Sequence, residues 1–307
     1  MKHQWRFRGN EIDYIKEVLI SGEGSSTAGN FNNEFEKLFA SKVGAKYGVT
    51  FNSGTSTLHA ALNALDVRHG DEVIVPPITV ISNFDVIIAS NAVPVFVDVD
   101  PYTFNIDIND LKSKITKKTK AIMPISVYGL SCDLDPIMEI AKENNIGVIN
   151  DAAEAHGSTY KNKPIGGIAD ITSYSTENSK HITTGDGGII TTNDEELATR
   201  MRKFGSLGYA AMKANEGRIR LDKSVFQDPS YKRHDSYGLN YRMPEVAAAV
   251  GLAQTERYEE FVERRVSLGK LMREVSEDSK IVLPQKKIEG SKNTYWTFAA
   301  RLVNPEI

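Results

Sequence analysis

Residues 71–90 read DEVIVPPITVISNFDVIIAS, a short Val/Ile-rich run followed at once by a helix-like segment. The same alternation recurs in KYGVTF (46–51) before TSTLHAALNAL, in VPVFVDVD (93–100) before INDLKSKI, and in KAIMPISVYG (120–129) before LDPIMEIAKENN. Several of these runs place Val or Ile on both alternating faces, as expected of strands that helices cover on both sides. The sequence therefore predicts an α/β fold with a mostly parallel open sheet and helices on both faces.

The pattern changes in the second half of the chain. Residues 209–236 mix charged, aromatic and small residues without a clear period, which indicates a long loop that can cover an active site. From residue 243 the sequence is strongly helical, and YWTFAARLV (295–303) is typical of a strand. We therefore expect a large domain, residues 1–240, and the start of a smaller C-terminal α/β domain, residues 241–307, on which the N-terminal segment 1–25 can pack. Because the sequence stops just after that strand, at residues 304–307, we expect the small domain to be incomplete.

The composition excludes several classes of protein. The 307 residues are 40% hydrophobic and carry a net charge of −3, with a pI near 6.1. A slightly acidic chain has no electrostatic attraction for nucleic acid or an anionic membrane, and no apolar stretch approaches the length of a membrane span. We therefore expect a cytoplasmic protein that binds neither. Cys132 is the only cysteine, which excludes an intrachain disulfide and a thiolate cluster, and we expect no metal site.

Two polar stretches follow strand-like runs. NSGTST (52–57) lies between a strand and a helix, where backbone N–H groups and the helix dipole favour an anion such as phosphate. Taken alone, this stretch fits an ordinary helix cap better. VINDAAEAHG (148–157) places Asp151 at the carboxyl end of an apolar strand, the edge at which open α/β sheets bind ligands. A capping carboxylate is an equal alternative for Asp151, and a hydrogen-bonded core histidine is one for His156.

Lys180 lies in STENSKHITTGDGG (175–188), between two β-like segments and before a glycine-rich turn, so it is not on the exposed face of a regular helix. This stretch, together with NSGTSTLHAAL, GDEVIVPP, VPVFVDVDPYTFNID, TKAIMPISVYG, DAAEAHG and GLNYRM, resembles the DegT/StrS family. These are pyridoxal-phosphate-dependent nucleotide-sugar aminotransferases with the aspartate aminotransferase fold (fold type I). The matching stretches cover nearly the whole chain in order and spacing.

The resemblance implies a role for three residues at the reacting end of the cofactor. Lys180 would form the Schiff base with pyridoxal 5'-phosphate and then act as general acid and base for the 1,3-proton shift. Asp151 would pair with the pyridine nitrogen and keep it protonated, so that the ring accepts electrons. Glu154 matches a position that approaches the ring hydroxyl.

The resemblance also implies how the cofactor phosphate is held. Gly54, Thr55 and Ser56 would bind it together with Ser175, and Asn240 in GLNYRM would reach it from a neighbouring subunit. The protein would then be a homodimer with shared active sites.

The activity implied is transfer of an amino group from an amino-acid donor, L-glutamate, to a keto group of a nucleotide-sugar substrate. Two other classes share the fold. In a pyridoxal-phosphate-dependent sugar dehydratase a histidine replaces the Schiff-base lysine, whereas here Lys180 is present and His181 follows it. A non-catalytic sensor or regulator would not need Asp151, Ser175 and Lys180 together.

The sequence departs from the family pattern at two positions. Val80 follows Thr79 where members usually have an aromatic residue that stacks on the cofactor ring, and Ser126 stands where many have histidine. The loop 209–236 also has a set of basic residues that fits either a contact with a diphosphate or a solvated charged surface: Arg218, Arg220, Lys223, Lys232 and Arg233.

Overall fold

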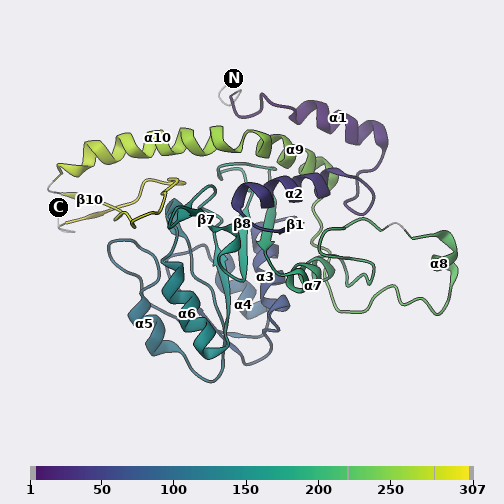
Figure 1. Ribbon diagram of the computed structural model, residues 1–307, viewed down its shortest axis with the longest axis horizontal. Coiled ribbons are helices and arrows are strands. Elements are labelled where there is room, and N and C mark those ends of the chain that lie inside the picture. Colours follow the sequence, from purple (N-terminus) through teal and green to yellow (C-terminus); the bar gives the residue numbers. More distant parts are fainter. Residues whose placement is uncertain (1–4, 220, 280, 304–307) are drawn as a thin grey trace.

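The computed structural model describes residues 5–219, 221–279 and 281–303, and its centre is a seven-stranded sheet (Figure 1). The strand order is β1-β9-β8-β5-β4-β2-β3. Within the described residues, β9 alone runs antiparallel to its neighbours, and the other neighbouring pairs are parallel. The predicted α/β class with a mostly parallel sheet is confirmed.

The elements have the following bounds. The sheet consists of β1 (Tyr47–Phe51), β2 (Glu72–Val75), β3 (Val93–Phe96), β4 (Thr119–Ile122), β5 (Gly147–Asp151), β8 (Ile171–Ser175) and β9 (Gly188–Thr192). Two small antiparallel pairs lie outside it: β6 (Thr159–Tyr160) with β7 (Lys163–Pro164), and β10 (Val282–Pro284) with β11 (Ala300–Leu302). The helices are α1 (Glu11–Ser21), α2 (Phe31–Val43), α3 (Gly54–Ala64), α4 (Ser82–Ala89), α5 (Ile108–Lys114), α6 (Leu134–Asn144), α7 (Glu195–Gly205), α8 (Lys223–Gln227), α9 (Glu245–Glu256) and α10 (Tyr258–Glu277), with short 3₁₀ turns η1 (Val127–Gly129) and η2 (Ile165–Gly167).

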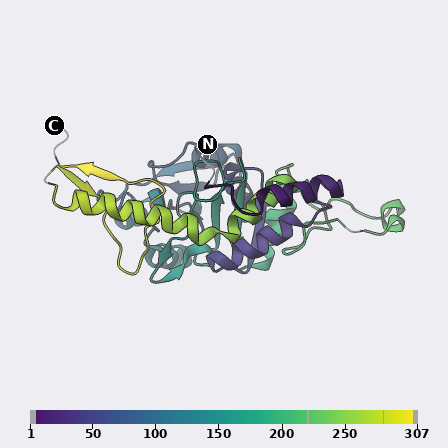
Figure 2. The same ribbon diagram turned by 90° about the horizontal axis from the view of Figure 1, so that it is seen from above.

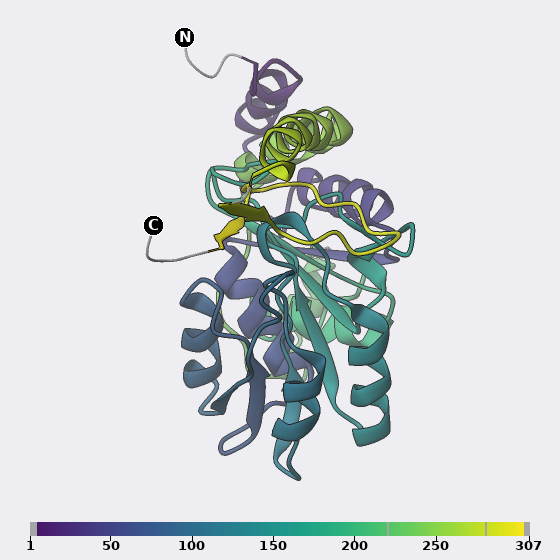
Figure 3. The ribbon, with the colours of Figure 1, turned by 90° about the vertical axis from the view of Figure 1, so that its left-hand side faces the viewer.

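Helices cover both faces of the sheet (Figure 3), and β2 shows why the three strand residues after Glu72 are all apolar. Val73 and Val75 belong to the core formed with α3, α4 and α7. Ile74, between them, belongs to the core formed with α2, α5 and α6. Since successive strand residues point to opposite faces, the buried positions of a strand between two helical layers are apolar on both faces, as the sequence predicts.

The N-terminal and C-terminal parts of the chain meet above the sheet (Figures 1 and 2). Helix α1 packs on α9, and Tyr14 donates a hydrogen bond of 2.6 Å to Glu256. Helix α9 also packs on α2, a helix within the range expected for the large domain. Helix α1 thus contacts a helix after residue 240, while the packing of segment 1–25 on a small domain and the domain boundary at residue 240 stay predictions; residues 1–4 and 304–307 lie outside the described residues.

Segment 209–236 runs outward from the body of the molecule (Figure 1). It is mostly irregular, as predicted, but contains the five-residue helix α8. Asp222 caps this helix by accepting a hydrogen bond from the Ser224 N–H. Arg220 lies outside the described residues.

Candidate active site

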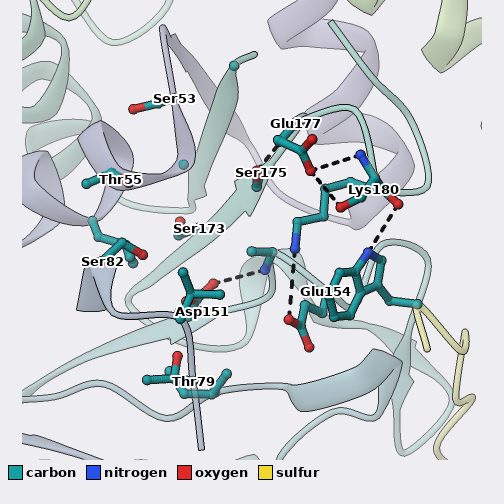
Figure 4. Close-up of a pocket in the computed structure, with 18 of the residues that line it drawn as sticks. Ser53, Thr55, Thr79, Ser82, Asp151, Glu154, Ser173, Ser175, Glu177 and Lys180 are labelled. Carbon is teal, nitrogen blue, oxygen red and sulfur yellow. Dashed lines mark hydrogen bonds and ion pairs between the residues drawn. The ribbon is translucent and has the colours of Figure 1, made fainter. Parts of the chain in front are cut away.

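The carboxyl ends of β5 and β8, the beginning of α3 and the loop after β8 surround a cavity of about 400 Å³ (Figure 4). A cavity of this size accommodates a small organic cofactor. Its walls contain Ser53, Gly54, Thr55, Leu58, Thr79, Val80, Ser82, Ile125, Asp151, Ala153, Glu154, Ser173, Ser175, Glu177, Ser179, Lys180, Asp186, Gly187 and Trp296. The structure therefore brings six of the predicted residues to one cavity: Gly54, Thr55, Asp151, Glu154, Ser175 and Lys180.

The beginning of α3 forms one wall. Ser53 caps the helix with an extended backbone, and its hydroxyl accepts a hydrogen bond of 3.1 Å from the Ser56 N–H. The first N–H groups of a helix have no partner within the helix, so this wall favours an anion. Ser56 itself does not line the cavity; its hydroxyl donates to Asn52, so its part in the site is to fix the cap.

Gly54 is required by the closeness of α3 to β8. A Cβ atom added to Gly54 would lie 2.9 Å from Cβ of Ser175 and 3.3 Å from its hydroxyl oxygen. The glycine thus allows the helix start and the Ser175 hydroxyl to border the same small space, which suits a phosphate group.

Asp151 ends β5 and is buried. The amide of Asn83 donates a hydrogen bond of 2.9 Å to its Oδ2, and the Ala153 N–H donates one of 3.0 Å to its Oδ1. Burial raises the pKa of Asp151, and these two bonds and the charge of Lys180 offset part of that rise. A carboxylate in this position is stabilised most by a cationic partner in the cavity.

Lys180 points its amine into the cavity toward Glu154 (Figure 4), and only 7% of the residue is exposed. Its Nζ lies 3.9 Å from Oε1 of Glu154. Burial lowers the pKa of Lys180, while the charges of Glu154 and Asp151 oppose that change. The amine is therefore closer to its neutral, nucleophilic form at neutral pH than an exposed lysine is.

The Glu154 carboxylate has a second partner at its other oxygen. Its Oε2 accepts a hydrogen bond of 2.8 Å from the Tyr128 N–H. Tyr128 has a φ of 59°, in the left-handed region that non-glycine residues seldom adopt. This unusual backbone conformation is compatible with a constraint imposed by the site.

Trp296 was not anticipated from the sequence. Its ring lines the cavity, with the Lys180 Nζ 4.0 Å from the ring centroid. The cavity thus has an aromatic wall although Val80, at the position where the family usually stacks an aromatic residue, is aliphatic. In the sequence, Trp296 lies in a strand-like stretch near the end of the chain, and nothing in that stretch indicates a contact with a ligand.

Other residues considered from the sequence lie elsewhere. Asn240 is exposed and pairs with Ser206, and neither Asn240 nor the described part of segment 209–236 lines the cavity. Ser126 is buried against Asn150. His156 is a buried histidine that interacts with the Ser175 carbonyl at 2.8 Å, which supports the reading of a hydrogen-bonded core residue.

Comparisons with known proteins identify the family of this chain. A sequence profile described as the DegT/DnrJ/EryC1/StrS aminotransferase family matches residues 6–306. The GDP-perosamine synthase of Caulobacter vibrioides is 40% identical over 300 residues, which cover 97% of this chain and 76% of that protein. The X-ray structure of an aminotransferase from Psychrobacter cryohalolentis superposes with a TM-score of 0.87 at 32% identity, covering 97% of this chain and 76% of the other.

A further solved structure is a GDP-4-keto-6-deoxymannose-3-dehydratase with a trapped PLP-glutamate geminal diamine. It has a TM-score of 0.86 at 27% identity and covers 96% of this chain and 77% of that chain. This chain belongs to the DegT/DnrJ/EryC1/StrS aminotransferase family, whose cofactor is pyridoxal phosphate.

The residues present fit pyridoxal phosphate. The cavity contains one amine, that of Lys180, and a buried carboxylate, that of Asp151. The start of α3 and Ser175 also line it side by side, so closely that a Cβ on Gly54 would lie 2.9 Å from the Cβ of Ser175. In the described part of the chain, no cluster of His, Cys, Asp and Glu side chains is arranged to hold a metal ion, and none of the helices there is both long and apolar enough to cross a membrane.

Proposed function

We propose that this chain transfers an amino group from L-glutamate to a keto group of a nucleotide-linked sugar, with Lys180 as the cofactor-binding lysine. The observation that carries this proposal is a buried lysine amine that enters the same cavity as a buried carboxylate and a helix start. When bound, the cofactor supplies an electron sink for the removal of a proton next to nitrogen.

Different residues of this chain have different roles in the proposed reaction. The Lys180 amine moves the proton between substrate atoms, because burial favours its neutral form and Glu154 holds it nearby. The Asp151 carboxylate holds a proton at the ring nitrogen of the cofactor, and Asn83 fixes the orientation of that carboxylate. The beginning of α3 and the Ser175 hydroxyl hold the phosphate.

The nature of the substrates is supported by the relatives. The GDP-perosamine synthase named above and a UDP-4-amino-4-deoxy-L-arabinose–oxoglutarate aminotransferase of Shewanella sediminis, 36% identical over 260 residues, 84% of this chain and 64% of that protein, are named for sugar nucleotides. The second name includes oxoglutarate, the keto acid that glutamate becomes when it gives up its amino group. We therefore propose L-glutamate as the donor.

We further propose a homodimer in which Asn240 reaches the phosphate of the neighbouring subunit. The exposed position of Asn240, outside its own chain's cavity, supports this arrangement. The large domain would then be residues 1–240, and the part that begins at residue 241 would carry α9 and α10.

The dehydratase alternative rests on similarity to the dehydratase structure described above. His181 is the residue that would have to act in place of a lysine. It is buried, its Nε2 lies 3.0 Å from the Thr294 carbonyl, and it does not line the cavity. The amine of Lys180 occupies the position that this chemistry would require of an imidazole, so the geometry favours transamination.

Borohydride reduction tests the proposal. Purified protein should bind pyridoxal phosphate with a visible absorbance band, and reduction followed by peptide mass spectrometry should find the cofactor on Lys180. Lys180→Ala should lose transamination yet bind the cofactor, whereas Lys161→Ala, which alters an exposed lysine paired with Asp135, should behave like the parent. A label on another lysine would refute the assignment. With glutamate and a nucleotide-linked keto sugar, formation of a deoxygenated sugar without an aminated one would instead establish the dehydratase.

A further inference from the structure

The two peptide groups on either side of the Lys180 Cα are held by three side chains from outside their own loop. Arg265 donates to the Ser179 carbonyl at 2.6 Å and to the Lys180 carbonyl at 3.2 Å. Arg6 donates to the Lys180 carbonyl at 2.7 Å, and Trp296 donates to the Ser179 carbonyl at 3.1 Å. Arg265 also donates to the Trp296 carbonyl at 2.7 Å, which connects the donors to one another.

These donors come from three distant parts of the chain. Arg6 precedes α1, Arg265 lies in α10, and Trp296 lies in the segment between β10 and β11. The main chain at Arg6 is fixed in turn, because its carbonyl accepts a hydrogen bond of 2.8 Å from Gln254 of α9. The position of the lysine main chain therefore depends on the N-terminal segment and on the helices after residue 240.

The guanidinium groups of Arg6 and Arg265 are charged donors, which are not needed merely to hold the main chain in place. In the described chain their hydrogen bonds go to backbone carbonyl groups, and burial lowers the pKa of both. Arg6 also lowers the pKa of Arg265, and Glu177 acts on Arg6 in the opposite direction. Both arginines are half-buried, and withdrawing charge from water without close carboxylate partners has a cost, whereas a neutral donor suffices to hold a carbonyl group.

We propose that Arg265 and Arg6 are positioning residues that clamp the main chain on both sides of the Lys180 Cα and so set the location of the reactive amine. This inference rests on the proposed function of Lys180. Two guanidinium groups on one carbonyl fix the direction in which the side chain leaves the main chain. A reacting group must be held to within a fraction of an ångström, because small misplacements reduce turnover strongly.

The charge of Arg265 also reaches the amine. It lowers the pKa of Lys180, in the same direction as burial and against three carboxylates. The groups that act on the amine are Glu154, Asp151, Glu177 and Arg265, and the charge of Lys180 in turn lowers the pKa of the buried imidazoles of His156 and His181. Removing the guanidinium should therefore raise the pH at which the amine loses its proton.

The test compares Arg265→Met with Arg273→Met. Arg273 also lies in α10 and donates to a backbone carbonyl, that of Gln285 at 2.7 Å, but it does not contact the lysine loop. Two properties are measured: kcat, and the pH dependence of Lys180 labelling by an amine-reactive reagent in full-length protein stripped of cofactor. For Arg265→Met we expect kcat to fall about tenfold to a hundredfold and the labelling midpoint to move to higher pH. Arg273→Met should leave both unchanged.

Two further variants keep the test decisive if Arg265→Met does not fold. Arg265→Lys retains the charge and loses the two-pronged geometry, so kcat should fall while the labelling midpoint stays near that of the parent. Arg6→Met should lower kcat without moving the midpoint. If borohydride still labels Lys180 but these variants match Arg273→Met in both measurements, the clamp is refuted and the proposed function stands. If borohydride labels a different lysine, the proposed function fails and the clamp with it.

Discussion

Gly54→Ala is a direct test of the phosphate-binding wall. The new methyl carbon would lie 2.9 Å from Cβ of Ser175 and 3.4 Å from its Cα, whereas carbon atoms in good contact are about 3.5–4.0 Å apart. Either α3 or β8 must move by several tenths of an ångström. β8 is buried along its whole length and is paired on both edges, so the start of α3 should give way.

The expected cost to folding is small. Overpacking of this kind lowers the unfolding free energy by about 1–3 kcal/mol. Replacing a glycine at a compatible position raises it by about 0.4–1 kcal/mol, because the unfolded chain becomes less flexible. The variant should therefore lose at most about 2–3 kcal/mol of unfolding free energy and remain folded. Cofactor binding should suffer more, because the displaced helix start and serine no longer converge on the phosphate. The loss of one charge-assisted hydrogen bond, about 1.5–3 kcal/mol, corresponds to affinity weakened about tenfold to a hundredfold.

The measurements are thermal unfolding without cofactor and the dissociation constant of pyridoxal phosphate from its absorbance. Gly24→Ala is the matched control, since nothing lies within 4 Å of a Cβ at Gly24, and it should change neither quantity. If Gly54→Ala bound the cofactor as tightly as Gly24→Ala does, the phosphate would not be seated between α3 and Ser175.

The residues that sequence reasoning placed in the site share a simple geometric property. Asp151 and Ser175 end neighbouring parallel strands, and Gly54 begins a helix that follows another strand. Strand ends in a parallel sheet meet at one edge. The strand pattern therefore explains why these residues lie together, but the resemblance to the family, not the local pattern, assigned Gly54 and Ser175 to the phosphate.

The residues that sequence reasoning missed depend on contacts that no local pattern encodes. Lys180 and Arg265 are 85 residues apart, and Arg6 is 174 residues from Lys180. Arginines on helices are usually solvated, so nothing in α10 marks Arg265 as a donor to the lysine loop. Asn83 lies near the start of α4, where a polar residue is normally interpreted as a cap, yet its amide points at Asp151.

Two further substitutions address the chemistry of the cavity. Asp151→Asn keeps the size of the side chain and removes its charge, so the protein should still bind pyridoxal phosphate while kcat falls about a hundredfold or more; unchanged turnover would assign Asp151 a structural role. Glu154→Gln removes a charge that raises the pKa of Lys180, while the glutamine oxygen can still accept the Tyr128 N–H. The pKa of the amine should then fall further below its ordinary value. The neutral amine is the form that captures the cofactor, so the rate of capture falls as the pH drops through the pKa of the amine. With a lower pKa, the midpoint of this fall in rate should move to lower pH. Stopped-flow absorbance of cofactor capture by stripped protein across a pH series measures that midpoint, and a shift toward higher pH would show that Glu154 does not stabilise the protonated amine.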